Sequence, residues 1–272
     1  AWFLWTGPDA SRLYSTAGFR PVRQFAIMRF NNTQPIKDMV MQTHPGVGKL
    51  MVIGAHAGDA ENMAAAVVLK HTRAGHQAVV VHLTLGAAGH PTRSPEEYAL
   101  QRQQEVQEAA RLMGASVICL PYRDGELPVN EEIKFEVCDL IRREKPTLIL
   151  THWKGSIHKD HIAAHAIVQD AVFYAALPGL QRELPPHRVQ GICYPENWED
   201  MEGWRADIYL DVSDVWEDYL AVLDSHELMR GGISSFRYRD YYDALGTVRG
   251  CLGGFRKAVA LMAPGSWVRR VA

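Results

Sequence analysis

Short apolar runs alternate with longer segments of helical periodicity from residue 49 to about residue 176. Such runs are typical of strands buried on both faces. Strands that alternate with helices of this length form right-handed crossovers, so they lie parallel in one sheet with helices on both faces. The predicted strands are residues 50–55, 78–83, 117–120 and 147–151, and the predicted helices are residues 59–74, 94–113, 131–144 and 159–176. The pattern therefore predicts an α/β fold with a Rossmann-like, mostly parallel sheet.

The helix boundaries carry local signals. Ser94 is a good N-cap because Pro95 takes the first helical position and Glu97 the third. Gly75 and Gly114 end the helices that precede them. After Pro195 the alternation loosens. The expected elements there are a strand at 207–212, a helix at 215–230 and a last helix after the aromatic segment 236–242.

The first 45 residues do not join this alternation. They contain a strand-like run at 24–30, followed by a polar stretch at 31–45 with two prolines, which predicts a linker. We therefore expect residues 46–272 to form one domain and residues 1–45 to form an N-terminal extension.

Composition narrows the class of protein. The 272 residues carry 29 basic and 31 acidic side chains, and so balanced a charge argues against a nucleic-acid partner, which would require a basic stripe. No run approaches the ~18 apolar residues of a membrane span. The first five residues lack the basic and apolar regions of a signal peptide. The four cysteines are scattered, which suits a reducing compartment, so we expect a cytoplasmic protein.

Candidate metal ligands follow two of the predicted strands. His56 and Asp59 come after the first strand, and His158 and His161 come after the fourth. Ligands bind at the carboxyl ends of parallel strands, and imidazole and carboxylate are the ligands that zinc prefers. Catalytic zinc sites use three protein ligands and a water molecule. The sequence therefore predicts a metal centre at this edge of the sheet, provided that the two strands are neighbours.

Three further residues near these strand ends are candidate substrate contacts, and each has a structural alternative. Asp124 is expected either to bind a substrate hydroxyl or to be a turn residue before a glycine. Arg123 suits a substrate phosphate or carboxylate, or else a surface ion pair. Trp153 is expected either to stack on a sugar ring or to pack its loop.

Four sequence blocks together resemble a known family. They are Ala-His-x-x-Asp-x-Glu at 55–61, Leu-Thr-Leu-Gly-x-x-Gly-His at 83–90, Pro-Tyr-Arg-Asp-Gly-Glu-Leu at 121–127, and Thr-His at 151–152 with His-x-Asp-His at 158–161. In this order they are similar to the PIG-L/LmbE-like zinc deacetylases. The resemblance covers residues 49–214 and is expected to extend to the C-terminus.

The resemblance implies both a reaction and roles for particular residues. His56, Asp59 and His161 match the family's zinc ligands. His158 matches the histidine that stabilises the tetrahedral intermediate or protonates the leaving amine, and Asp160 matches the carboxylate that orients it. The implied reaction is zinc-dependent hydrolysis of an N-acetyl group on an amino sugar or a related small acetamido substrate. Homo-oligomers are common in the family, so a homo-oligomer is expected by the same resemblance.

One departure from the family pattern affects the chemistry. The usual first motif is His-Pro-Asp-Asp, and its first Asp is the general base, but Gly58 stands at that position here. Three interpretations stay open: Glu61 or Asp160 replaces the base, zinc generates enough hydroxide while His158 handles the proton, or the protein is a non-catalytic metal- or sugar-binding relative. Loss of one acid–base group typically costs about 10²–10⁴ in rate.

A second, shorter resemblance lies in the N-terminal extension. Residues 10–22, with Leu-Tyr-x-x-x-Gly-Phe at 13–19, resemble the last helix and strand of GNAT-type N-acetyltransferases. By that resemblance Tyr14 matches the general acid, but the strands that would complete an acetyl-CoA site are not in the sequence. The segment is expected either to pack on the deacetylase-like domain or to be the end of an acetyltransferase fused to it.

Overall fold

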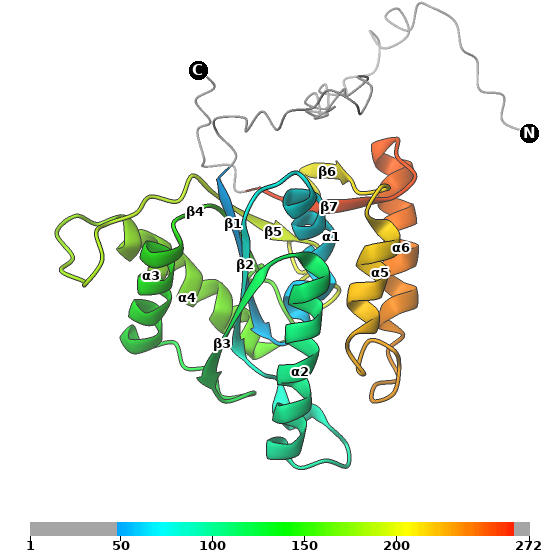
Figure 1. Ribbon diagram of the computed structural model, residues 1–272, viewed down its shortest axis with the longest axis horizontal. Coiled ribbons are helices and arrows are strands. Elements are labelled where there is room, and N and C mark those ends of the chain that lie inside the picture. The colour runs from blue at the N-terminus through cyan, green and yellow to red at the C-terminus, as the bar shows by residue number, and fades with distance from the viewer. Residues whose placement is uncertain (1–47, 264–272) are drawn as a thin grey trace, which may run out of the picture.

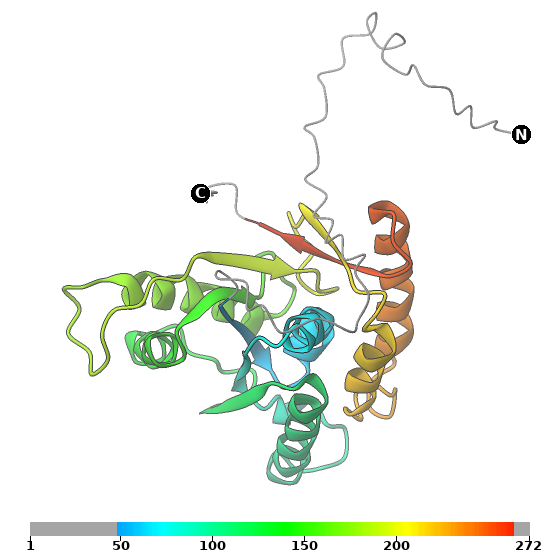
Figure 2. The ribbon, with the colours of Figure 1, turned by 45° about the horizontal axis from the view of Figure 1, so that its top comes forward.

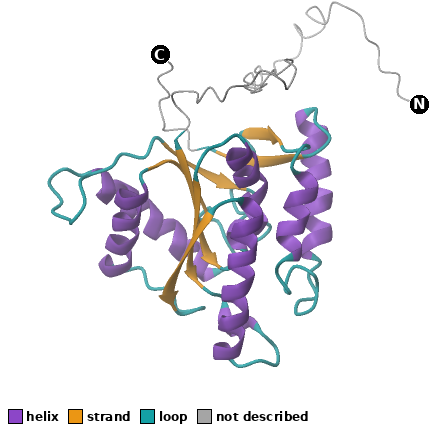
Figure 3. Cartoon of the chain, viewed as in Figure 1, coloured by secondary structure: helices purple, strands orange, loops and turns teal. Residues whose placement is uncertain are grey.

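Seven strands form one sheet in the order β3-β2-β1-β4-β5-β7-β6 (Figures 1 and 3). The strands are β1 (Lys49–His56), β2 (Ala78–Thr84), β3 (Ser116–Tyr122), β4 (Pro146–Thr151), β5 (Gly191–Pro195), β6 (Ile208–Asp211) and β7 (Ala258–Met262). This computed structural model describes residues 48–263. The predictions for residues 1–45, including Tyr14, lie outside the described residues.

The strands β1 to β5 pair with one another in parallel, whereas β7 is antiparallel to both β5 and β6. The predicted α/β fold with a mostly parallel, Rossmann-like sheet is therefore confirmed. The strands β5 and β7 are not predicted by the sequence pattern. Both have only five residues, and a short apolar run cannot be assigned to a strand by periodicity alone.

Helices cover both faces of the sheet. They are α1 (Asp59–Arg73), η2 (Ala87–Gly89), α2 (Pro95–Met113), α3 (Glu131–Glu144), α4 (Lys159–Ala176), α5 (Trp216–Asp224) and α6 (Tyr238–Gly253). Helices α3 and α4 lie on one face, and α1, α2 and α5 lie on the other (Figure 2). None of the helices between residues 48 and 263 is long and apolar enough to cross a membrane.

Alternate residues of β1 belong to the two halves of the core. Met51 and Ile53 are buried in the cluster that includes α3 and α4, whereas Leu50 and Val52 are buried in the cluster that includes α1. Because side chains alternate along a strand, this two-sided burial explains why β1 is an uninterrupted apolar run. A strand packed on both faces holds its C-terminal residue, His56, in a fixed place.

The local boundary signals act as expected. The Ser94 side chain accepts a hydrogen bond from the Glu97 amide, and the Glu97 carboxylate accepts one from the Ser94 amide. Gly114 ends α2 with φ +63°, a backbone conformation that favours glycine. The helix predicted at 215–230 is too long: α5 ends at Asp224, and turns follow it. In those turns His226 becomes fully buried.

Candidate metal centre

The candidate ligands meet where the strand order reverses. Strands β1 and β4 are adjacent and parallel, so their carboxyl ends lie together between α1 and α4. His56 ends β1, Asp59 begins α1, His152 follows β4, and His161 lies in the first turn of α4. In sheets of this topology the crevice at this point is where ligands bind. The condition that the first and fourth strands be neighbours is therefore met.

One carboxylate oxygen, Asp59 Oδ2, lies at the middle of the group. It is 3.1 Å from His56 Nδ1, 3.3 Å from His161 Nε2 and 3.2 Å from His152 Nε2. It also accepts a 2.8 Å hydrogen bond from the His56 amide, which closes the turn between β1 and α1. The structure thus brings the three predicted metal ligands together.

His161 is oriented by a residue that the sequence analysis did not find. Its Nδ1 donates to Asp200 Oδ1 at 2.8 Å, so Nε2 faces Asp59. The other oxygen of Asp200 accepts from His152 Nδ1 at 2.7 Å, and the two imidazole rings stack with centroids 3.9 Å apart. A carboxylate behind a histidine in this way is the usual support of a metal ligand. Asp200 is 39 residues from His161, and no sequence signal connects them.

His152 is a support rather than a free ligand. It is fully buried, and its Nε2 accepts a 3.0 Å hydrogen bond from the Ala55 amide while its Nδ1 is engaged by Asp200. The ring therefore ties the end of β4 to β1 and packs against His161.

Two more carboxylates face the other side of His56. His56 Nε2 is 3.3 Å from Asp124 Oδ1 and 3.3 Å from Asp160 Oδ2. Backbone amides fix both carboxylates, since Asp124 accepts from Ala88 at 2.9 Å and Asp160 accepts from Gly125 at 2.7 Å. The structure thus places Asp124 at the centre, and its contact with a substrate hydroxyl stays a prediction.

The charges of the centre suit a cation. Burial by itself lowers the pKa of both imidazoles, but Asp59 and the neighbouring carboxylates raise the pKa of His56 to about 12 and that of His161 to about 10. Without a metal ion, His56 and His161 therefore carry extra protons, and a bound metal ion would supply positive charge in their place. Three sets of donor atoms lie within 4.8 Å of one another: His56, His158 and His161; Asp59, His152 and His161; and His56, Asp124 and Asp160. Imidazole nitrogen with carboxylate oxygen fits zinc.

His158 lies beside the centre with one nitrogen engaged. Its ring centroid is 4.6 Å from that of His56 and 4.8 Å from that of His161. Burial and the charges of these two histidines lower its pKa, so the ring is neutral at pH 7. Nδ1 accepts a 3.2 Å hydrogen bond from the Asp160 amide, which leaves the proton on Nε2.

The prediction that the Asp160 carboxylate orients His158 is wrong in its detail. The contact is made by the backbone amide of Asp160, whereas its carboxylate faces His56 and Gly125. The reason is that His158 is the N-cap of α4, so its ring nitrogen satisfies an amide of the first helical turn.

Glu61 lies away from these side chains. It is fully buried, and its Oε2 accepts a 2.9 Å hydrogen bond from the Gly58 amide because Glu61 is the third residue of α1 and turns back to the N-cap. Its Oε1 lies 3.3 Å from His82 Nε2 and 3.9 Å from His226 Nε2. These contacts give Glu61 a role in holding the loop before α1, and none of them supports the predicted role of a general base.

The predicted substrate contacts Arg123 and Trp153 make structural contacts. The Arg123 side chain is 83% exposed and lies 3.5 Å from Glu126. The Trp153 indole donates to the Glu202 carbonyl at 2.9 Å, and its ring packs edge-on against Tyr194. Their roles in substrate binding stay predictions.

Glu199 is a further carboxylate at the centre that the sequence analysis missed. Its Oε2 lies 3.7 Å from His161 Nε2, and its side chain is 18% exposed. Burial raises the pKa of this carboxyl above its ordinary value. Residues 197–200, Asn-Trp-Glu-Asp, follow β5 and supply both Glu199 and Asp200.

The position of the family's usual base is filled by other side chains. Gly58 has φ +97°, and a Cβ built on it would lie 2.9 Å from Met229 Cε and 3.0 Å from Arg102 Nη2. Arg102 is buried and donates to the Ala57 carbonyl and to Glu105. The loop is therefore packed around a glycine.

Replacing Gly58 by the family's usual aspartate is expected to destabilise the protein. Gly58→Asp should lower the free energy of unfolding by about 1–3 kcal/mol, because the backbone has a positive φ and the tips of Met229 and Arg102 must shift to admit the side chain. We expect no gain in turnover, since Arg102 would pair with the new carboxylate. Urea titration and rate measurements check this, with Gly58→Ala as the control for backbone strain. A faster Gly58→Asp enzyme would contradict this interpretation.

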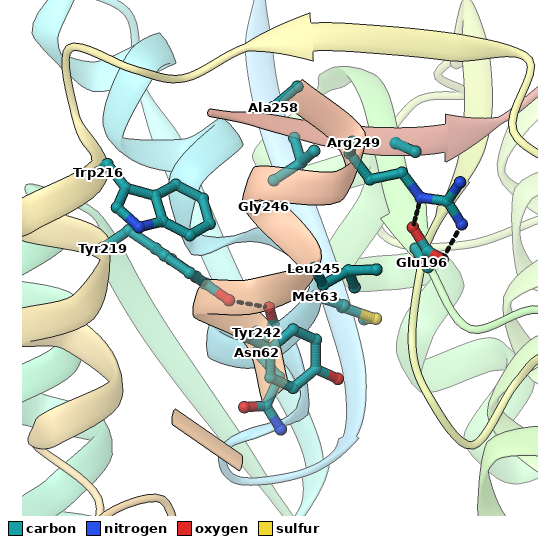
Figure 4. Close-up of a pocket in the computed structure, with 12 residues that line it drawn as sticks. Asn62, Met63, Glu196, Trp216, Tyr219, Tyr242, Leu245, Gly246, Arg249 and Ala258 are labelled. Atoms are coloured by element: carbon teal, nitrogen blue, oxygen red, sulfur yellow. Dashed lines mark hydrogen bonds and ion pairs between the residues drawn. The ribbon is translucent and has the colours of Figure 1, made fainter. Parts of the chain in front are cut away.

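A small cavity of about 20 Å³ lies elsewhere, between α1, α5, α6 and β7 (Figure 4). In it the Tyr219 hydroxyl donates to the Asn62 carbonyl at 2.8 Å, and Arg249 forms an ion pair with Glu196. Its lining contains no histidine, and it has room for about one water molecule. This cavity is a packing feature of the core.

The fold and the donor set define an α/β protein with a candidate metal centre at the switch point of its sheet. Residues 51–172 match the PIG-L family, described as GlcNAc-PI de-N-acetylase. Residues 51–172 thus match a PIG-L family domain, as the sequence blocks predict.

Similar proteins include both a deacetylase and a hydratase. The chain is 29% identical over 194 residues to the diacetylchitobiose deacetylase of Thermococcus kodakarensis, covering 66% of this chain and 70% of that one. It is 26% identical over 186 residues to the 4-oxalmesaconate hydratase of Pseudomonas putida, covering 64% and 70%. The structure of a 4-carboxy-2-hydroxymuconate hydratase from P. putida matches with a TM-score of 0.75 at 22% identity, covering 83% and 99%. The prediction of an enzyme of this deacetylase family is confirmed.

Proposed function

We propose that the protein is a zinc-dependent hydrolase that removes an N-acetyl group from an amino sugar or a related small acetamido compound. The observation that carries this proposal is the convergence of His56, Asp59 and His161 at the switch point of a PIG-L domain, with His161 oriented by Asp200. Similarity to a diacetylchitobiose deacetylase supports the acetamido sugar as the substrate class.

The chain's own residues divide the work of the reaction. His56, Asp59 and His161 would hold the metal ion. When bound, zinc polarises the acetyl carbonyl and lowers the pKa of its water toward ~7. The Nε2–H of neutral His158 is placed to donate a hydrogen bond to the oxygen that becomes negative when the carbonyl is attacked. Asp124 is placed to accept from a substrate hydroxyl.

A second candidate function is the addition of water to an unsaturated carboxylate, and similarity to a hydratase favours it. A third, a non-catalytic metal- or sugar-binding relative, is favoured by Gly58, which stands where the family's usual acid is expected. The three candidates differ in what the metal-loaded protein does to its ligand.

Metal analysis and acetate release test the proposal. Protein purified without added metal is expected to contain about one zinc per chain and to release acetate from N-acetylglucosamine conjugates. Hydration of an unsaturated dicarboxylate without acetate release would establish the second candidate. Bound metal without turnover of either substrate would establish the third, and a chain that takes up no metal would overturn the metal centre itself.

Metal uptake by the metal-free protein is expected to release about two protons at pH 8. The raised pKa values of His56 and His161 mean that both rings carry a proton at this pH, and zinc binds only the neutral ring. The apparent affinity should therefore rise about 100-fold per pH unit up to about pH 10, the pKa of His161, and about tenfold per unit above it, where only His56 still carries its extra proton. Calorimetry in buffers of different ionisation enthalpy counts the protons. Binding without proton release would show that these histidines are not ligands.

A further inference from the structure

Most carboxylates at the metal centre are already engaged. Four of them contact imidazole nitrogens: Asp59, Asp124, Asp160 and Asp200. Three of these four, Asp59, Asp124 and Asp160, also accept from backbone amides. Asp160 and Asp200 are fully buried. These four are positioned to orient ligands or to bind the metal ion, so part of their hydrogen-bonding capacity is already used.

Glu199 differs from the other four. Its side chain makes one ion-pair contact among the described residues, to His161 Nε2 at 3.7 Å, and its carboxylate accepts no hydrogen bond from the part of the chain between residues 48 and 263. Its side chain is 18% exposed, so water can reach it. Glu199 is thus a carboxylate with unused hydrogen-bonding capacity beside a candidate metal ligand.

The backbone of Glu199 is held in place although its side chain is free. Its amide donates to Asn197 Oδ1 at 3.2 Å, and its carbonyl accepts from the Ile157 amide at 3.0 Å. The second contact ties the loop after β5 to the segment that leads into α4, directly before His158. The neighbouring Asp200 is fixed by His152 and His161. The backbone of Glu199 therefore keeps its place relative to the ligands, and the side chain extends from a fixed point.

We propose that Glu199 is the catalytic base of this centre and takes the role of the acid that is absent at Gly58. The assignment rests on the proposed hydrolysis. Glu199 accepts one proton as the O–H bond of water breaks, and the water oxygen forms a bond to the acetyl carbon. When the C–N bond breaks, that proton and the remaining hydroxyl proton pass to the amine nitrogen. The products are acetate and the protonated amine, so atoms and charge balance.

Variants of Glu199 test the assignment. Glu199→Gln is expected to lower kcat for an N-acetylglucosamine conjugate by about 10²–10⁴-fold and to change KM by less than about threefold. It should still bind one zinc per chain. Added formate should restore part of the rate that Glu199→Ala loses, because this small carboxylate can accept the proton in place of the missing side chain. A merely structural role of Glu199 would give no such recovery. Glu202→Gln, on the exposed part of the same loop, is the matched control and should behave as wild type.

A binding measurement makes the test independent of turnover. Acetohydroxamate needs a base to accept its proton when it binds the metal-loaded protein, so Glu199→Gln should weaken its affinity about 10- to 100-fold. If wild type shows no acetate release but this dependence holds, the proposed hydrolysis fails and the assignment of Glu199 as proton acceptor stands. Wild-type kcat and wild-type hydroxamate affinity in Glu199→Gln would overturn the assignment. Loss of zinc from this variant would also overturn it, since Glu199 would then be a ligand.

Discussion

His161→Ala is expected to lose the bound metal ion and to lower kcat/KM for an acetamido substrate by at least about 10⁴-fold. His161 Nε2 faces the central oxygen of Asp59, and its Nδ1 is fixed by Asp200. The ring is 1% exposed, so its removal leaves a gap inside the protein beside Asp59. Metal content of the purified variant and single-turnover acetate release give the two readouts.

Two further variants make this result specific. Asp200→Asn keeps the shape of the supporting side chain but removes its charge, and it should cost about 10- to 100-fold in metal affinity or activity. His76→Ala removes a histidine that precedes β2, at the end of the sheet opposite the centre, and it should leave metal content and rate unchanged. A His161→Ala protein that keeps one zinc per chain would remove His161 from the ligand set.

Glu61→Ala is expected to lower the free energy of unfolding by about 3–5 kcal/mol, the typical cost of breaking a buried charge pair. Glu61 is fully buried, and its carboxylate faces His82, His226 and the Gly58 amide. Burial by itself raises the pKa of Glu61, but the two histidines outweigh it and lower the pKa to about 2. Urea unfolding of the metal-free protein at pH 7 measures the loss.

The pH dependence of this loss follows from the lowered pKa. Because the pKa of Glu61 in the folded protein lies below its ordinary value of 4.5, its stabilisation is fully present above about pH 4.5 and is lost as the pH falls toward 2. The difference between wild type and Glu61→Ala should therefore be largest near pH 7 and should shrink in acid. Glu108→Ala, on the exposed face of α2, should show no measurable change. Equal stability of Glu61→Ala and wild type at pH 7 would show that the contacts of Glu61 with His82 and His226 do not stabilise the fold.

The sequence by itself determined the parallel core of the fold and the main donors of the centre. Glycines, an N-cap serine and apolar runs act through their immediate neighbours, so helix and strand boundaries could be predicted from them. His56, Asp59 and His161 could also be predicted to meet, because the carboxyl ends of neighbouring parallel strands lie at one edge of a sheet.

Only the tertiary structure decided what surrounds those donors. Asp200 and Glu199 reach the centre because β5 lies beside β4, and no local pattern links this loop to α4. Glu61 turns inward to the N-cap of α1, although its sequence position suggested a base. Arg102 and Met229, from distant segments, fill the space beside Gly58. The direction of a side chain and the filling of a space depend on packing between elements far apart in the chain, and a single sequence does not contain that information in readable form.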